Sequence, residues 1–74
     1  MDIQNLVKMA NQIGAFFEAM PDRPQAMQDI AGHIKRSWDP RMRQAILQYL
    51  DEQGGTELKA IVREALFKHK NDVA

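Results

Sequence analysis

The 74-residue sequence has no cysteine and no net charge, and these two absences exclude several classes of protein. A chain without cysteine forms no disulfide and no thiolate metal site, and its composition suits a reducing compartment. Ten lysines and arginines balance ten aspartates and glutamates. Bulk charge therefore argues against general binding to nucleic acid or to a membrane surface. A chain with so little net charge also repels itself weakly, so self-association in isolation is compatible with the composition.

Long apolar runs are missing as well. The N-terminal segment opens with Asp2 and contains polar residues throughout, so it lacks the basic start and the unbroken apolar stretch of an export signal. No segment is apolar over the length that a membrane span requires. We therefore expect a cytoplasmic protein with no membrane partner. The length predicts a single helical domain over residues 1–74, with a core near the lower size limit for independent stability.

Residues that commonly perform catalysis or bind metals are scarce. Ser37 is the only serine, and His33 and His69 are expected on different helices. Asp29, His33 and Ser37 share one helix face, but a short helical bundle offers no evident oxyanion hole or substrate cleft. The sequence contains neither a cluster of zinc ligands nor a glycine-rich phosphate loop. We therefore predict no catalytic, cofactor-binding or metal-binding residue, and no small-molecule substrate.

Turn-forming residues divide the chain into four helical segments, and no segment alternates as a half-buried strand does. The predicted helices run over residues 2–19, 24–36, 40–53 and 56–69. Thr56 is expected to cap the last of them, and residues 71–74 are expected to form a frayed tail. The predicted fold class is all-α, a compact small bundle of four short amphipathic helices.

The first predicted helix has an unusually wide apolar face, which covers about half of its circumference. The centre of this face is formed by Ile3, Leu6, Val7, Ala10, Ile13, Gly14 and Phe17. Met9, Phe16 and Met20 extend it. One neighbouring helix does not cover a face this wide, so it needs either two neighbours within the domain or a surface on another protein. Gly14 would allow a second helix to approach closely.

The other helices have narrower apolar faces. Their predicted inner residues are Ala26, Met27, Ile30, Ala31 and Ile34, then Met42, Ala45, Ile46, Tyr49 and Leu50, and finally Leu58, Ile61, Val62, Ala65 and Leu66. Leu47 is expected at one edge of the third helix. Phe67 projects from the far side of the fourth helix, but single exposed aromatic residues are common on protein surfaces.

The segment Trp38–Arg43 joins the second and third helices and is the most unusual stretch of the chain. Asp39 suits an N-cap, and Pro40 suits the first helical position. Arg41 and Arg43 fall in the first helical turn, where the helix dipole disfavours cations. Two interpretations follow. The tryptophan fills the gap between the second and third helices, or this corner contacts a partner.

The basic residues around this corner suggest an alternative function, in which the chain binds nucleic acid in the manner of a helix-turn-helix protein. Two observations count against it. Arg41 and Arg43 would project about 160° apart on the helix, and the chain has no net charge. We therefore expect no nucleic-acid partner.

The chain as a whole resembles the delta subunit of the cytoplasmic, NAD-dependent formate dehydrogenases that contain molybdenum or tungsten. The resemblance is carried by residues 6–13 with Phe16 and Phe17, by residues 30–34, by residues 38–43 and more weakly by residues 61–66. Met-Ala-Asn-Gln-Ile and Trp-Asp-Pro-Arg-Met at this spacing form a specific combination. The chain departs from the family at Ser37, where an aromatic residue often stands, and at Lys59-Ala60, where a proline is often found.

The resemblance implies a non-catalytic accessory subunit of a complex that oxidises formate to carbon dioxide and reduces NAD. The molybdenum- or tungsten-pterin centre, the iron–sulfur clusters, FMN and NAD would then belong to partner subunits and none of them to this chain. The delta subunit would dock on the large catalytic subunit and stabilise it or help it mature. A maturation factor that leaves after cofactor insertion is one alternative, and a free-standing homodimeric helical interaction module is another.

The surfaces expected to contact the partner are the wide face of the first helix and the corner between the second and third helices. Tryptophan, methionine and arginine are enriched at such interfaces, and a few anchors carry most of the binding energy. The predicted partner-binding residues are Trp38, Asp39, Pro40, Arg41, Met42, Arg43, Met9, Phe16 and Met20.

Overall fold

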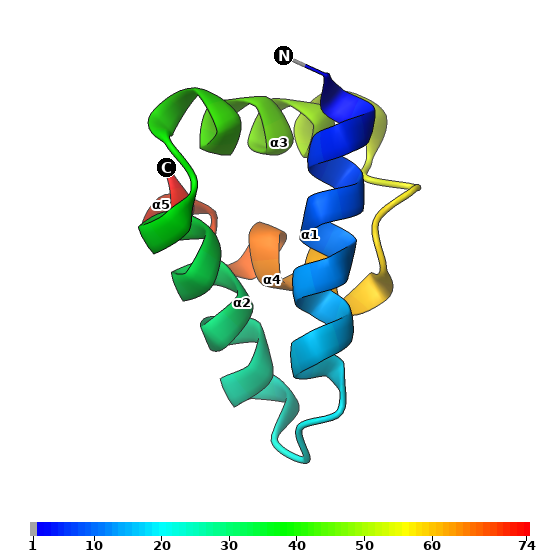
Figure 1. Ribbon diagram of the computed structural model, residues 1–74, viewed down its shortest axis with the longest axis vertical. Coiled ribbons are helices and arrows are strands. Elements are labelled where there is room, and N and C mark those ends of the chain that lie inside the picture. The colour runs from blue at the N-terminus through cyan, green and yellow to red at the C-terminus, as the bar shows by residue number, and fades with distance from the viewer. Residues whose placement is uncertain (1) are drawn as a thin grey trace.

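Helices account for most of the protein in a computed structural model that describes residues 2–74. They are α1 (Ile3–Glu18), α2 (Arg23–Ser37), α3 (Pro40–Gln53), α4 (Ala60–Lys68) and α5 (Lys70–Val73). Figure 1 shows α1 and α2 diverging from the turn that joins them, α3 crossing the open end of the pair, and α4 packed behind both. The described residues contain no strand, so the predicted all-α bundle is confirmed. Within residues 2–74, no helix has the length and hydropathy needed to cross a membrane.

Aspartate residues begin the first three helices. The caps are Asp2, Asp22 and Asp39, and the carboxylate of each accepts a hydrogen bond from a backbone amide of the first turn. Asp39 Oδ1 accepts from Met42 N at 3.0 Å, and Pro40 follows in the first helical turn. The predicted roles of Asp39 and Pro40 at the start of α3 are therefore confirmed. An aspartate cap of this kind typically stabilises a helix by about 0.5–2 kcal/mol relative to alanine.

The fourth helix begins four residues later than predicted. Thr56 does not cap it, because the chain forms a turn after α3 and α4 begins only at Ala60. Gly54 and Gly55 both have left-handed backbone angles, with φ of 75° and 65°. Two successive left-handed residues redirect the chain, and Leu58 then enters the core before the helix starts.

The C-terminal residues are not a frayed tail, and that prediction was wrong. The segment forms the short helix α5, in which the side chain of Val73 is fully buried. This helix packs against α2. Lys70 also forms an ion pair with Asp51 of α3. The segment offers one apolar side chain and no periodicity, so the sequence pattern gave no sign that this side chain would anchor it.

The core contains the inner faces predicted for the second and fourth helices in full. Its buried members from α3 are Ile46, Leu47, Tyr49 and Leu50. Leu47, expected at an edge, is thus buried, whereas Met42 and Ala45 are only partly covered. These two half-covered residues lie near the start of α3, beside the α2–α3 corner.

The wide apolar face of α1 is covered in its centre and open along one edge. α2, α3 and α4 all contact α1, so neighbours within the chain do cover more than one side of it. The buried residues of α1 are Leu6, Val7, Ala10 and Gly14. Met9, Ile13 and Phe17 are half-buried, and the Phe16 side chain is 76% exposed. Neighbours within the chain therefore explain the centre of the face, and contact of its open edge with another protein stays a prediction.

Gly14 lies where α1 and α4 approach each other closely. A Cβ atom at this position would lie 2.3 Å from Cγ2 of Val62, whose side chain is fully buried. Real Cβ atoms do not tolerate this distance, so the crossing requires glycine here. The close helix approach predicted at Gly14 is confirmed.

We expect Gly14→Ala to lower the free energy of unfolding by about 1–2 kcal/mol. Overpacking against Val62 outweighs the gain in helix propensity, which is at most about 1 kcal/mol. Gly32→Ala is the matched control, because a Cβ there meets only the flexible end of the Arg36 side chain. It should raise the free energy of unfolding by about 0.5–1 kcal/mol. Urea denaturation measures both changes, and equal stabilisation by the two substitutions would disprove the close contact.

Candidate docking groove

Three helices line an apolar groove with a volume of about 540 Å³. We call it the α1–α2–α3 groove. Its lining residues are Met9, Gln12, Ile13, Phe16, Phe17, His33, Ser37, Trp38 and Met42. The open edge of α1 and the α2–α3 corner were predicted separately as partner-binding regions. The structure brings parts of both to one surface.

Aromatic rings connect α1 with α2 in this groove. The rings of Phe16 and Phe17 meet edge to face, with centroids 5.0 Å apart and an interplanar angle of 88°. The Phe17 ring lies 6.3 Å from the His33 ring on α2. Both geometries are typical of favourable aromatic pairs. Phe16 nevertheless remains 76% exposed, so most of its apolar surface is available to another molecule.

The lining of the groove carries almost no charge. None of its nine residues is a lysine, arginine, aspartate or glutamate, and His33 is the only ionisable one. Ser37 Oγ donates a hydrogen bond to the His33 backbone oxygen at 2.6 Å, and Asp29 accepts one from Gln25 at 3.0 Å. Asp29, His33 and Ser37 are therefore not arranged as a hydrogen-bonded triad. The groove suits apolar groups.

Trp38 lies in the core between α2 and α3 and is only 4% exposed. Its backbone N–H donates to the carbonyl oxygen of Ile34 at 2.9 Å and so ends α2. This position matches the interpretation in which the tryptophan fills the gap between the two helices. The small part that stays accessible lines the groove.

Arg43 is held by the corner itself, a role that the sequence did not reveal. Its Nη1 donates to the backbone oxygens of Trp38 at 2.9 Å and Lys35 at 3.2 Å. These carbonyl groups belong to the C-terminal end of α2, where cations are favourable. The positive charge of Arg43 is thus unfavourable for the dipole of α3, its own helix, but favourable for the dipole of α2. Only the folded corner, in which the two helix ends meet, shows this.

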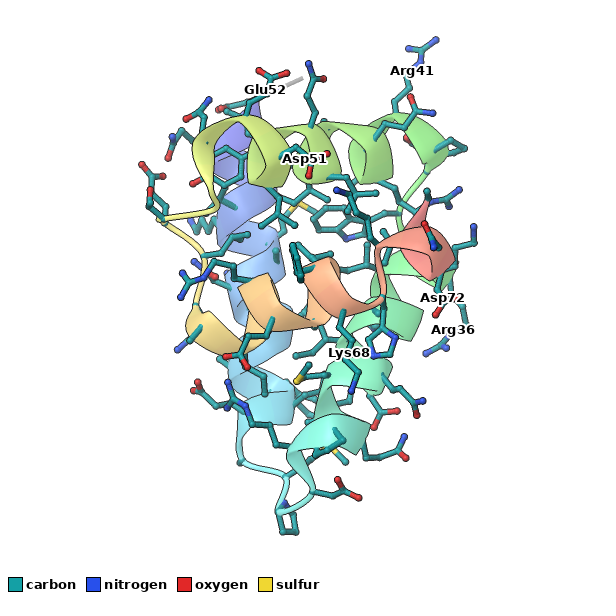
Figure 2. All side chains as sticks on the ribbon, turned by 180° about the vertical axis from the view of Figure 1, so that it is seen from behind. Arg36, Arg41, Asp51, Glu52, Lys68 and Asp72 are labelled. Atoms are coloured by element: carbon teal, nitrogen blue, oxygen red, sulfur yellow. The ribbon has the colours of Figure 1, made fainter. Side chains whose placement is uncertain are left out.

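The other predicted partner-binding residues differ in accessibility. Arg41 is exposed, points away from the body of the protein (Figure 2), and makes no hydrogen bond or ion pair with residues 2–74. Asp39 and Pro40 are exposed but build the start of α3. Met42 is half-buried in the groove. Met20 is half-buried near the α1–α2 turn, outside the groove lining.

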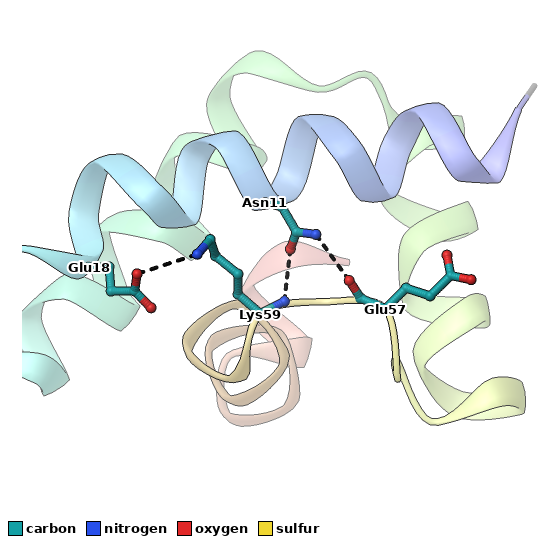
Figure 3. Close-up of polar contacts among 4 residues, drawn as sticks. All are labelled: Asn11, Glu18, Glu57 and Lys59. Carbon is teal, nitrogen blue, oxygen red and sulfur yellow. Dashed lines mark hydrogen bonds and ion pairs between the residues drawn. The ribbon is translucent and has the colours of Figure 1, made fainter.

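Asn11 of α1 forms hydrogen bonds with the segment that precedes α4 (Figure 3). The sequence did not reveal this role. Asn11 Nδ2 donates to the Glu57 backbone oxygen at 3.0 Å, and Asn11 Oδ1 accepts from Lys59 N at 2.8 Å. Lys59 Nζ also lies 3.4 Å from a carboxylate oxygen of Glu18. The Asn11 amide thus both donates to and accepts from backbone groups that lie 46 and 48 residues away in the sequence.

We expect Asn11→Asp to destabilise the protein by about 1–3 kcal/mol. The new carboxylate still accepts from Lys59 N–H, but it sets an unpaired oxygen against the Glu57 carbonyl oxygen. Asn5→Asp makes the same chemical change on the exposed first turns of α1, where a negative charge is favourable, and should shift stability by less than about 0.5 kcal/mol. Thermal denaturation at neutral pH compares the two variants, and equal losses would contradict this role of Asn11.

The proline that the resemblance leads us to expect at Lys59-Ala60 would be compatible with this fold at position 60. Ala60 is the first residue of α4, a position where proline is favourable because its missing N–H has no helical partner. Lys59 has φ −56° and ψ 148°, a conformation that the residue before a proline readily adopts. A proline at position 59 itself would remove the N–H that Asn11 binds.

A second groove, of about 670 Å³, lies on the α4 side of the molecule. Its lining residues are Met27, Leu50, Asp51, Gly54, Arg63, Glu64, Phe67 and Lys68. Figure 2 looks onto this side. Phe67 is 72% exposed, as predicted, but half of the lining residues are charged. Arg23 pairs with Glu64 at 2.7 Å across the helices. The second groove is therefore the more highly charged of the two.

Comparisons with known proteins match most of the chain to one family model. The model described as NADH-dependent formate dehydrogenase delta subunit FdsD matches residues 5–66. No curated protein and no solved structure matches the chain. The matched range includes every residue that lines the α1–α2–α3 groove.

Proposed function

The chain belongs to the family of NADH-dependent formate dehydrogenase delta subunits, and on that premise we propose that it is a non-catalytic accessory subunit that docks on the large catalytic subunit. The complex would oxidise formate to carbon dioxide and reduce NAD in the cytoplasm. The molybdenum- or tungsten-pterin centre, the iron–sulfur clusters, FMN and NAD would be bound by the other subunits. This chain would contribute contact area.

The observation that carries the proposal is the uncharged groove with Phe16 at its edge. Contiguous exposed apolar surface on a small protein marks an interaction site, and aromatic and methionine side chains are typical anchors. Met9, Phe16 and Met42 supply such side chains along one groove. The second groove has one exposed aromatic ring among charged residues, so we assign docking to the α1–α2–α3 groove.

Docking of this kind would stabilise the large subunit by mass action. A protein that binds only the folded form of its partner stabilises that form by about 2.7 kcal/mol when its free concentration is 100 times the dissociation constant. The same effect would hold a partly assembled subunit in a folded state while cofactors are inserted. Stabilisation and maturation therefore follow from one binding event.

A tagged pull-down of this chain from its native cells, with mass spectrometry of the retained proteins, tests the proposal. We expect a large pterin-type subunit with its iron–sulfur and flavin partners, together with formate-dependent reduction of NAD. Stoichiometric presence in the purified active complex would identify a permanent subunit rather than a transient maturation factor. Retention of a second copy alone would contradict the proposal and favour the homodimeric module.

A further inference from the structure

The charges of this neutral chain are unevenly distributed along the sequence. Residues 33–43 contain the four cations Lys35, Arg36, Arg41 and Arg43 and the single anion Asp39, a formal charge of +3. The rest of the chain contains six cations and nine anions, a formal charge of −3. We call residues 33–43 the basic corner.

Contacts among residues 2–74 leave this positive charge without a paired anion. The ion pairs of residues 2–74 join Arg23 with Glu64, Lys59 with Glu18, His69 with Asp72 and Lys70 with Asp51, all outside the basic corner. The Asp39 carboxylate accepts from the backbone of α3. Lys35, Arg36 and Arg41 are exposed. Figure 2 shows Arg41 pointing away from the body of the protein, and the guanidinium of Arg36 lies along the surface of α2 beside Gly32.

The basic corner borders one end of the α1–α2–α3 groove. His33, Ser37, Trp38 and Met42 line the groove and lie within the basic corner. Ser37 directly follows Arg36 in the sequence, and Met42 directly follows Arg41. Along α1 the groove extends from Met9 to Phe17, a rise of about 12 Å or two helical turns. An uncharged groove of limited length thus ends at a positively charged surface.

We propose, resting on the docking function proposed above, that the groove receives an apolar segment of the large subunit with carboxylates at the end beside the basic corner. The apolar side chains of this segment would fill the groove, and its carboxylates would pair with Arg36 and Arg41. Arginine suits this role because its planar guanidinium binds a carboxylate through two parallel hydrogen bonds. A nucleic-acid backbone would satisfy the arginines but leave the apolar lining uncovered, so the structure favours a protein segment.

Charge reversal in the full-length chain tests this inference. The binding partner is the formate dehydrogenase complex purified from cells that lack this chain, titrated at 50 mM and at 1 M NaCl. Arg36→Glu and Arg41→Glu should each weaken binding about tenfold at low salt and less than about twofold at 1 M, where the Debye length is about 3 Å. Lys68→Glu is the control, because it makes the same charge change on an exposed residue of α4. It should change binding less than about twofold.

Folding of the variants is checked separately. Arg41→Glu places an acid in the first turn of α3, so its melting temperature should equal or exceed that of the wild type even as binding weakens. Wild-type binding that neither salt nor the two arginine variants weaken would overturn the inference and leave the docking function standing. Absence of wild-type binding would overturn both. Retention of a labelled DNA duplex that is lost only in the arginine variants would also overturn the inference, because the corner would then bind nucleic acid.

Discussion

Trp38→Ala should remove a large part of the stability of the protein. Removing a buried tryptophan side chain typically costs about 3–5 kcal/mol, since a cavity remains where the ring packed. A domain of this length has a total stability on the order of 4–11 kcal/mol. Trp38 is only 4% exposed and lies between α2 and α3, so the substitution removes packing contacts between these two helices. Circular dichroism and urea denaturation would show reduced helicity and a lower midpoint.

Trp38→Phe is the matched variant for this experiment. Phenylalanine keeps an aromatic ring in the cavity, and no hydrogen bond from the Trp38 indole to residues 2–74 is lost. The free energy of unfolding should therefore decrease clearly less than in Trp38→Ala. Helicity and stability of Trp38→Ala equal to the wild type, combined with loss of the complex, would contradict the core-packing role. The tryptophan would then be a contact residue.

Phe16→Asp should weaken binding to the large subunit by about 30-fold or more while leaving the fold intact. Truncating an anchor side chain of an interface typically costs about 2 kcal/mol or more, and here the new carboxylate would lie at the edge of an uncharged groove. Phe16 is 76% exposed in the free chain, so the substitution should cost less than about 1 kcal/mol of stability. Quantitative retention of the large subunit by the tagged variant measures the effect.

Phe67→Asp is the control for Phe16→Asp, since the chain offers a second phenylalanine with nearly the same exposure. Phe67 is 72% exposed but lies at the charged groove on the α4 side. The same substitution there should change retention less than about twofold. A greater loss from Phe67→Asp than from Phe16→Asp would place the interface on the opposite groove.

The sequence predicted the fold well where a local pattern determines it. The periodic apolar residues of the second helix, from Ala26 to Ile34, are buried as expected. Asp39 and Pro40 begin α3 as their chemistry requires. These features depend on neighbours within a few residues, so helical periodicity and capping rules are sufficient to find them.

Features that depend on distant residues were missed. Val73 is buried because α5 packs on α2, and Asn11 binds backbone groups more than 40 residues away. Arg43 caps the end of a helix other than its own. Periodicity identifies the inner face of a helix but not which helices meet or where they cross, so no local pattern reveals these contacts.

The candidate site was predicted in parts. The wide apolar face of α1 and the α2–α3 corner were both identified, yet only the helix arrangement shows that Phe16 and Met42 line one groove. The fold also separates residues that the sequence grouped together. Arg41 is exposed, whereas Trp38 and Arg43 stabilise the corner itself.

A photo-crosslinking amino acid placed at position 16 or position 67 of this 74-residue chain would show which groove contacts the large subunit. Each variant would be irradiated within the assembled formate dehydrogenase complex, and the adducts would be identified by mass spectrometry. The proposed docking predicts that position 16 crosslinks to the large catalytic subunit and that position 67 gives little or no adduct with it. Adducts with the large subunit from position 67 alone, or position 16 adducts formed only with a second copy of this chain, would contradict the account.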